Sequence, residues 1–471
     1  MSMKLAAGAL VLLVAASGAA LGCSSSPDAS SEAPPAADLL GLVPMQDENP
    51  DPNVVEVTLE AREGMKTYGT SKPTPVWTYN GSVPGPFIDA KVGDRVIIKF
   101  KNSLPEPTTI HWHGIRLPAT MDGTLAMQSP IPPGESFRYE FVFKDAGLYW
   151  YHPHVRSDMQ VQKGLHGVIR VRAANEPQVD REHVLMLDDV RLKADGTLAE
   201  YLDDTAKMMG REGNTLLVNG VTDATLPMRP GASTRLRLVN VANGRFFNLR
   251  LPGHTWRVIG HDGGFLEKPY DTEHVLLAPG ERYDVMVIAS GAAASVIDLI
   301  DDPYERGHES GKRAPQPVAH VRFTEEAALE GRMLPSAFPP VAALPADAPR
   351  VPLVLNEGSH DGELVFTFNG VTFPDLPHVE VERNGVRILE LKNDSEMDHP
   401  FHLHGFFFQV LEKNGVPQAL VSMGNKDTII VPALSSLKLV SRFDEPGHWM
   451  FHCHILEHAE GGMMGEIHVE E

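Results

Sequence analysis

The residues best suited to chemistry are histidines that occur in pairs separated by a single residue. Four such pairs lie along the chain: His111 and His113, His152 and His154, His402 and His404, and His452 and His454. Imidazole nitrogens are good ligands for copper and zinc, and four pairs supply eight of them. Because one tetrahedral zinc ion needs only four ligands, the pattern predicts a cluster of metal ions.

The last pair encloses a cysteine, Cys453, and two further possible ligands follow it, His458 and Met463. In a β-strand successive side chains point to opposite faces, so His452 and His454 would point away from Cys453. Two histidines and one cysteine with a distant methionine form the trigonal blue-copper site. The five-residue spacings allow Cys453, His458 and Met463 to meet at one ion, whereas the second histidine must come from elsewhere in the chain.

The sequence has two cysteines, Cys23 and Cys453. Residues 1–22 are typical of an export signal, and the stretch that ends at Cys23 resembles a bacterial lipoprotein cleavage site. We therefore expect a signal segment over 1–23, a lipid on Cys23, and export to the periplasm or cell envelope. Cys453 would then be the only thiol of the folded part, and metal ligation is a reason for an exported protein to keep one unpaired thiol.

Three stretches repeat a turn, an alternating strand and a final asparagine: Gly93–Asn102, Gly231–Asn240 and Gly385–Asn393. Their spacing of well over a hundred residues predicts three copies of one β domain. A second repeat supports this count, because Pro133-Gly134-Glu135 and Pro279-Gly280-Glu281 each precede a predicted strand.

These repeats predict domains over 54–175, 176–325 and 350–471. Residues 24–53 are rich in Ser, Ala, Pro and acidic residues, and we expect a disordered tether there. Residues 326–349 are rich in Ala and Pro and would form a connector with room for a short helix.

The four histidine pairs and the run Phe451-His452-Cys453-His454 resemble, in type and order, the motifs of the multicopper oxidases, in particular the three-domain, laccase-like bacterial branch. The resemblance extends from about residue 54 to the C-terminus. It implies an all-β fold of three cupredoxin-like Greek-key β-sandwich domains and a cofactor of four copper ions, one type 1, one type 2 and two type 3. Since the middle domain has no histidine pair, we expect it to orient the outer domains, which must meet to build the cluster.

The resemblance also implies a role for each ligand. His111 and His402 would bind the type 2 copper. One type 3 copper would take His113, His152 and His454, and the other would take His154, His404 and His452. The type 1 copper would take His399, Cys453 and His458, with Met463 as the axial ligand.

The same resemblance implies the path of the electrons. Electrons would pass from the type 1 copper through Cys453 to His452 and His454, and four of them would reduce O2 to two waters. Asp122 follows His113 at the place where similar oxidases have an acid that relays protons; the alternative is an ordinary turn aspartate before glycine. Many bacterial relatives have a glutamate directly after the second type 1 histidine. Here that position is Ala459, followed by Glu460, so the sequence does not determine whether a second proton route exists or whether Glu460 replaces the missing glutamate.

The formal charge of −21 argues against a nucleic-acid partner, which needs a basic face. No apolar run after the signal is long enough to cross a bilayer, so we expect membrane contact only through the N-terminal lipid, and a monomer.

The electron donor is the least determined part of the function. Phenols and aromatic amines are the first expectation. The alternative is a cuprous oxidase in copper tolerance, for which Glu396 and Met397 before His399 would offer ligands. A copper-free relative that acts in binding or envelope assembly fits less well, because all ten histidines of the motifs and Cys453 are present. Nitrite reduction also fits less well, since that family lacks the second full set of histidine pairs.

Overall fold

The computed structural model describes residues 39–70, 72–199, 203–308, 310–418 and 424–471. The expected signal segment and the lipidated Cys23 lie outside the described residues. Strands dominate, and the all-β class expected from the sequence is confirmed. No helix in the described ranges has the length and apolar character needed to cross a membrane.

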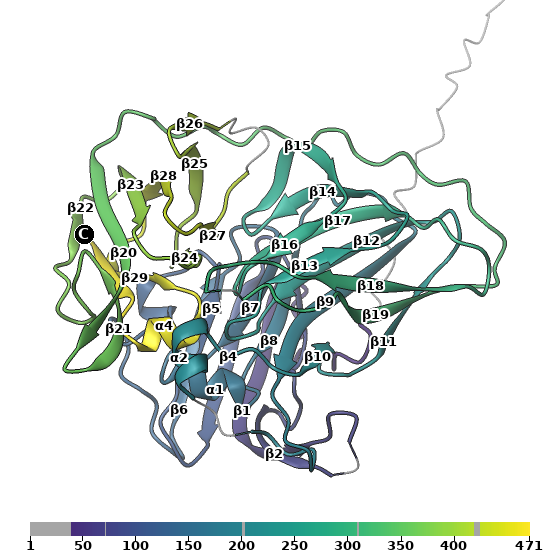
Figure 1. The fold of residues 1–471 in the computed structure, drawn as a ribbon, viewed down its shortest axis with the longest axis horizontal. Helices are drawn as coiled ribbons and strands as arrows, with labels where there is room; N and C mark the ends of the chain where they lie inside the picture. Colours follow the sequence, from purple (N-terminus) through teal and green to yellow (C-terminus); the bar gives the residue numbers. More distant parts are fainter. Residues whose placement is uncertain (1–38, 71, 200–202, 309, 419–423) are drawn as a thin grey trace, which may run out of the picture. The chain divides into compact units, whose positions relative to one another are not determined.

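Three pairs of sheets follow one another along the chain (Figure 1). The first pair consists of β1 (Val54–Lys66), β2 (Thr74–Tyr79), β3 (Ile88–Lys91), β4 (Arg95–Ser103), β5 (His111–His113), β6 (Ser136–Val142), β7 (Gly147–His152) and β8 (Gly167–Arg172). Its sheets have the strand orders β2-β1-β4-β6 and β3-β8-β7-β5.

The second pair consists of β9 (Arg181–Val190), β10 (Thr215–Val218), β11 (Ala224–Met228), β12 (Ser233–Asn240), β13 (Phe247–Arg250), β14 (Trp256–His261), β15 (Gly264–Thr272), β16 (Val275–Leu277), β17 (Arg282–Ile288), β18 (Val296–Asp302) and β19 (Gln316–Phe323). Its sheets have the orders β10-β9-β12-β17-β14-β15 and β11-β19-β18-β13-β16. The connector at 326–349 contains neither helix nor strand.

The third pair consists of β20 (Arg350–His360), β21 (Glu363–Phe368), β22 (Val379–Val381), β23 (Gly385–Asn393), β24 (His399–Leu403), β25 (Phe408–Lys413), β26 (Val416–Pro417), β27 (Thr428–Val431), β28 (Ser436–Phe443), β29 (Gly447–Cys453) and β30 (Met464–Val469). Its sheets have the orders β21-β20-β23-β28-β25-β26 and β22-β30-β29-β24-β27.

The asparagines that end the three repeated stretches form the same pattern of hydrogen bonds in each domain. Each is buried at the end of its strand, β4, β12 or β23, and its side-chain amide donates to two backbone carbonyls: Asn102 to Glu106 and Ile131, Asn240 to Arg245 and Leu277, and Asn393 to Met397 and Val431. Each side-chain oxygen also accepts the backbone N–H two residues later. A buried amide with all these bonds satisfied holds the loop after the strand in one conformation.

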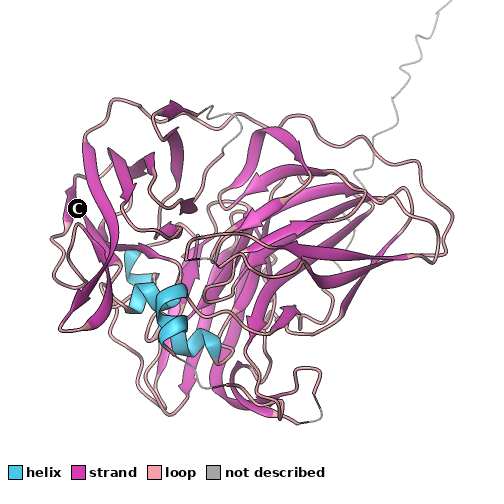
Figure 2. Ribbon diagram, viewed as in Figure 1, coloured by secondary structure: helices cyan, strands magenta, loops and turns pink. Residues whose placement is uncertain are grey.

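Three short helices, one from each domain, lie side by side (Figure 2). They are α1 (Ser157–Gln162), α2 (Asp204–Met209) and α4 (Leu456–Glu460), and a 3-10 turn, η1, covers Ala119–Met121. Helix α4 directly follows β29, so the three helices meet next to the cysteine motif.

Residues 39–53, which the sequence assigns to the tether, lie against the first domain. Leu42 is buried, and the Met45 N–H donates to the Phe87 carbonyl. Burial of the apolar Leu42 side chain removes apolar surface from water, which favours this packing. The part of the tether before residue 39 lies outside the described residues.

Candidate metal centre

The register of two strand pairs brings the histidine pairs together. In the first domain β5 pairs with β7, with His111 opposite His152. In the third domain β24 pairs with β29 in the same way, with His402 opposite His452. Directly opposite residues share one face of a sheet, so each outer domain presents its histidines as one patch.

The two patches face each other, as expected for a site between the outer domains. The rings of His111 and His404 stack with centroids 3.9 Å apart, and those of His113 and His402 with centroids 3.8 Å apart. Three groups have ligand atoms within 4.8 Å of one another: His111, His113 and His402; His113, His152 and His454; and His154, His404 and His452. All eight paired histidines are buried.

One nitrogen of several of these rings is fixed by the protein. The Nδ1 atoms of His152, His402 and His452 lie 2.8 to 3.0 Å from the carbonyls of Pro153, Asp427 and Cys453. Seven other ring nitrogens have no hydrogen-bond partner among the described residues; they are His111 Nε2, His113 Nδ1, His152 Nε2, His154 Nε2, His402 Nε2 and both nitrogens of His454. His404 Nε2 and His452 Nε2 lie 3.0 Å from each other. Buried polar atoms without partners are costly, and a metal ion satisfies them. The residues therefore fit a cluster of copper ions.

Burial also sets the protonation state of these rings. It lowers the pKa of His154 to about 3, and neighbouring His111 contributes in the same direction. Burial likewise lowers the pKa values of His113, His152 and His404 well below the ordinary value. The imidazoles are neutral near pH 7, which is the form that binds metals.

Cys453 forms a second site on the other face of β29. Its Sγ lies 3.6 Å from His399 Nδ1 and 3.8 Å from His458 Nδ1, and these two nitrogens are 3.2 Å apart. The outer nitrogens of the histidines are held by Ser395 Oγ at 2.8 Å and by the Met208 carbonyl at 3.0 Å. Burial raises the pKa of the thiol and lowers that of His399 to about 3, so a cation is needed to stabilise a thiolate here.

Met463 is fully buried close to this site. Its backbone carbonyl accepts the N–H of Cys453, and its own N–H donates to the carbonyl of His458. The loop after α4 thus returns the chain to the cysteine, which places Met463 beside two of the proposed type 1 ligands.

The carboxylate of Asp122 contacts two histidines of the cluster. One oxygen lies 2.9 Å from His404 Nδ1 and the other 3.2 Å from His111 Nδ1, and the side chain is fully buried. This carboxylate contacts histidines of both outer domains.

The two glutamates that follow Cys453, Glu457 and Glu460, form hydrogen bonds with residues outside the ligand groups. Glu460 is exposed and accepts hydrogen bonds from the N–H and hydroxyl of Ser157, the first residue of α1. Glu457 is buried, which raises its pKa, and it accepts a hydrogen bond from Asn243. Glu457 was not singled out from the sequence, because burial is not visible in the motif.

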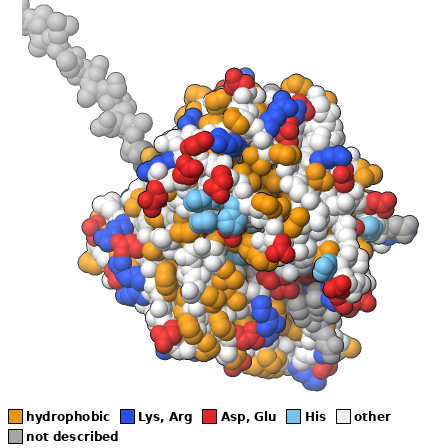
Figure 3. All heavy atoms as spheres, turned by 90° about the vertical axis from the view of Figure 1, so that its left-hand side faces the viewer, with side chains coloured by type: hydrophobic (Ala, Val, Ile, Leu, Met, Phe, Trp, Pro, Cys, Tyr) orange, Lys and Arg blue, Asp and Glu red, His pale blue; other side chains and the backbone are white. Residues whose placement is uncertain are grey.

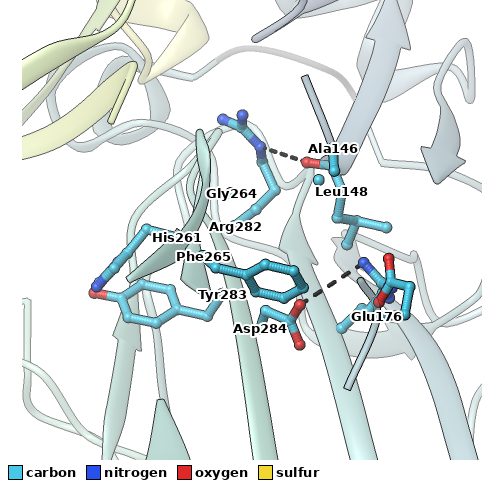
Figure 4. A pocket seen from close by; sticks show the side chains of 11 residues that line it. Ala146, Leu148, Glu176, His261, Gly264, Phe265, Arg282, Tyr283 and Asp284 are labelled. Carbon is cyan, nitrogen blue, oxygen red and sulfur yellow. Dashed lines mark hydrogen bonds and ion pairs between the residues drawn. The ribbon is translucent and has the colours of Figure 1, made fainter. Parts of the chain in front are cut away.

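The sequence motifs also gave no sign of Thr428 and Asp427, two buried residues that lie beside His113 and His402. Thr428 Oγ lies 3.2 Å from His113 Nε2 and 3.0 Å from His402 Nδ1, and it donates to Asp427 at 2.8 Å. Arg282, from the middle domain, binds both oxygens of Asp427. Its Nε donates to the Leu148 carbonyl of the first domain at 2.9 Å, the contact drawn in Figure 4.

The middle domain reaches the cluster at a second point, Gly280. A Cβ on Gly280 would lie 2.8 Å from a ring carbon of His454 and 3.0 Å from one of His113. The repeat Pro279-Gly280-Glu281 therefore packs against ligands of both outer domains. The expectation that the middle domain orients the outer ones missed this direct contact.

The multicopper oxidase family models match residues 61–176, 181–295 and 345–471. The chain belongs to the multicopper oxidase family. It is 31% identical to the multicopper oxidase MmcO of Mycobacterium tuberculosis over 82% of this chain and 81% of the relative. It is 30% identical to the multicopper oxidase mco of Staphylococcus epidermidis over 88% of each chain.

Among solved structures, this multicopper oxidase resembles one from Campylobacter jejuni, described as a metallo-oxidase, with a TM-score of 0.82 and 30% identity over 93% of this chain and 96% of that one. The three domains are cupredoxin-like, as expected from the sequence. The cofactor of a multicopper oxidase is four copper ions, one type 1, one type 2 and two type 3, and the histidine groups are consistent with it.

Proposed function

We propose that this multicopper oxidase takes electrons one at a time at the Cys453 site and delivers them to O2 at the histidine cluster. The observation that carries the proposal is the position of Cys453, the last residue of β29, between His452 and His454. Cys453 belongs to one group of ligand atoms, and its two neighbours, His452 and His454, belong to two groups of the histidine cluster. The backbone of a single strand thus joins the two sites covalently.

The proposed ligand sets follow the groups of atoms. His399, Cys453 and His458 form the type 1 site, with Met463 axial. His111 and His402 form the type 2 site. The type 3 sites are formed by His113, His152 and His454, and by His154, His404 and His452.

Copper in these sites supplies the one-electron chemistry, by which four electrons and four protons convert O2 to two waters. The protein residues orient the ligands and supply protons. Asp122 is the proposed relay, because its carboxylate is buried and lies within 3.2 Å of rings from both outer domains.

For the donor, we propose a small metal ion, Cu(I), ahead of phenols. Both type 1 histidines are fully buried, and the Met208 carbonyl of α2 covers the outer nitrogen of His458. The aromatic ring of a phenol donor therefore finds no exposed atom of either histidine ring to contact. Beside α2 lies a cavity of about 340 Å³ whose lining includes Asp203, Met209 and Glu212. The thioether of Met209 is a soft ligand of the kind that suits Cu(I).

Phenols and aromatic amines are the second candidate, favoured by a different cavity. This cavity, of about 510 Å³, is lined by Tyr270, Tyr283, Tyr304 and Ile430, among others. Ile430 pairs in register with Pro400, the neighbour of His399. Aromatic side chains provide the contacts that an aromatic donor prefers.

The two donors are separated by turnover measurements on the copper-loaded enzyme with Cu(I) and with a methoxyphenol. Asp203→Asn keeps a residue that can cap α2 but removes a charge, and we expect kcat/KM for Cu(I) to fall several-fold while phenol turnover is unchanged. Ile430→Trp fills the tyrosine cavity and serves as the matched variant. If only Ile430→Trp lowers activity, and only with the phenol, the Cu(I) assignment is wrong.

We further propose that the protein is exported, carries a lipid on Cys23 and acts as a monomer at the cell envelope. The support is the N-terminal sequence pattern. Cys23→Ala should release the enzyme from the membrane fraction into the soluble one, whereas an unchanged distribution would contradict lipid anchoring.

A further inference from the structure

Three histidines and two glutamates gather on the third domain, away from the ligand groups described above. They are His378, His448, His468, Glu380 and Glu466, called here the histidine-glutamate patch. Figure 3 views the molecule from the side of β22, and a contiguous group of histidine side chains with acidic side chains beside it is visible there.

Strand register places the members of the patch on one face of a sheet. His448 of β29 is opposite His468 of β30, which is opposite Glu380 of β22. Glu466 precedes His468 by two residues in β30, so alternation puts the side chains of His448, His468, Glu380 and Glu466 on the same side. His378 directly precedes β22 and contacts Glu466 from the loop.

The distances within the patch leave room for an ion. Glu466 Oε2 lies 3.3 Å from His378 Nε2 and 3.4 Å from His448 Nδ1. Both distances are longer than the 2.7 Å hydrogen bond between His468 and Glu380. In a tetrahedral site with bonds of about 2.0–2.1 Å, two ligand atoms lie about 3.3–3.4 Å apart.

Charge and access also suit a cation. The side chain of Glu466 is 12% exposed, whereas those of His378 and His448 are 43% and 34% exposed, so the carboxylate forms the floor of a site that solvent can reach. Within the described ranges, neither Glu466 nor Glu380 forms an ion pair with a lysine or arginine. The negative charge of Glu466 is therefore available to an ion.

We propose that His378, His448 and Glu466 bind one divalent transition-metal ion, such as Zn²⁺, Ni²⁺ or Cu²⁺, at a site separate from the four copper sites. His468 stacks on His448 with ring centroids 4.4 Å apart and is held by Glu380, so it orients the His448 ring. Imidazole and carboxylate ligands suit these ions. The site is four residues from His452 along β29, or about 13 Å at the rise of a strand.

The test uses untagged, copper-loaded enzyme dialysed against Zn²⁺, with bound zinc counted by atomic emission. We expect one additional zinc ion per chain and unchanged blue absorption, which shows that zinc has not displaced the type 1 copper. Glu466→Gln and His448→Ala should each weaken zinc binding at least tenfold. His360→Ala is the matched control, because His360 is an exposed histidine of the same domain that lies outside the patch and pairs with the exposed Asp361.

Spectroscopy with Co²⁺ adds a readout of geometry, since four-coordinate Co²⁺ with nitrogen and oxygen ligands has intense visible bands that the two patch variants should lose. If His448→Ala does not keep its blue absorption, His378→Ala tests the same site from outside the strands. The proposal is overturned if the enzyme binds no zinc beyond the level of the patch variants, or if His360→Ala lowers binding equally.

Discussion

Arg282 of the middle domain binds Asp427 of the third domain through both terminal guanidinium nitrogens, at 2.5 and 2.6 Å. Burial alone would raise the pKa of Asp427, but Arg282 holds it well below the ordinary value. The carboxylate in turn fixes Thr428, which contacts rings of His113 and His402. An arginine from a domain without metal ligands thus positions ligands of both other domains.

Replacing Arg282 by Met should therefore damage the cluster and leave the type 1 site intact. The variant leaves a buried carboxylate unpaired, which costs about 3–5 kcal/mol of stability. We expect a lower melting temperature and a weaker near-ultraviolet shoulder, with the blue band retained. Arg257→Ala is the control, because it removes a more exposed Arg–Asp271 pair of the same domain and should change stability by less than about 1 kcal/mol. Equal loss of both absorption bands would contradict a role specific to the cluster.

Gly280→Ala should also disturb the cluster, by direct contact. Gly280 has φ of 85°, and an added Cβ would meet the rings of His454 and His113. Gly134 occupies the equivalent turn of the first domain with the same φ of 85° and nothing within 4 Å of an added Cβ. Gly134→Ala should cost only the backbone strain, about 1–2 kcal/mol. The near-ultraviolet absorption per copper should fall in Gly280→Ala alone, and similar spectra for both variants would refute the contact.

Asp122→Asn should slow the oxygen half of the reaction. The variant keeps the size of the side chain but loses an acid, and a positioned acid contributes about 100-fold or more to proton transfer. Stopped-flow mixing should show normal reduction of the blue band by the donor and slower recovery after O2 is added. Slowing of both phases by the same factor would show that Asp122 acts only on structure.

Met463→Leu tests the axial ligand. Leucine cannot donate a sulfur lone pair, so the type 1 reduction potential should rise. The exchange nearly conserves volume at this buried position and should cost less than about 1.5 kcal/mol. Redox titration of the blue band measures the potential, and an unchanged value would exclude Met463 from the ligand set.

The copper-free protein should lose stability as the pH falls. The folded-state pKa values of His154 and His399 are lowered to about 3, below the unfolded value of about 6.5. The unfolded chain therefore binds more protons between these values, and stability present above pH 6.5 is lost as the pH falls toward 3. Each such histidine should contribute a loss of about 1.4 kcal/mol between pH 7.5 and 5.5. Thermal unfolding of apoprotein across this range measures it, and a flat profile would contradict neutral buried rings.

The sequence was sufficient to predict candidate ligands, because their chemistry and spacing are local properties. Alternation along a strand separates Cys453 from His452 and His454 in any β-strand, and histidine pairs with one residue between them indicate metal binding without any knowledge of the fold. The three repeated stretches likewise predicted three domains, since each carries its own strand and terminal asparagine.

Contacts between distant segments were decided only by the tertiary structure. Arg282 and Asp427 are 145 residues apart, and neither lies in a motif that marks it as a partner of the other. The same holds for Gly280 beside His454 and for the patch formed by His378, His448 and Glu466. A sequence determines which atoms can bind a metal, whereas packing between domains determines which buried charges are neutralised and which rings are held in place, because both depend on neighbours that the chain brings together only on folding.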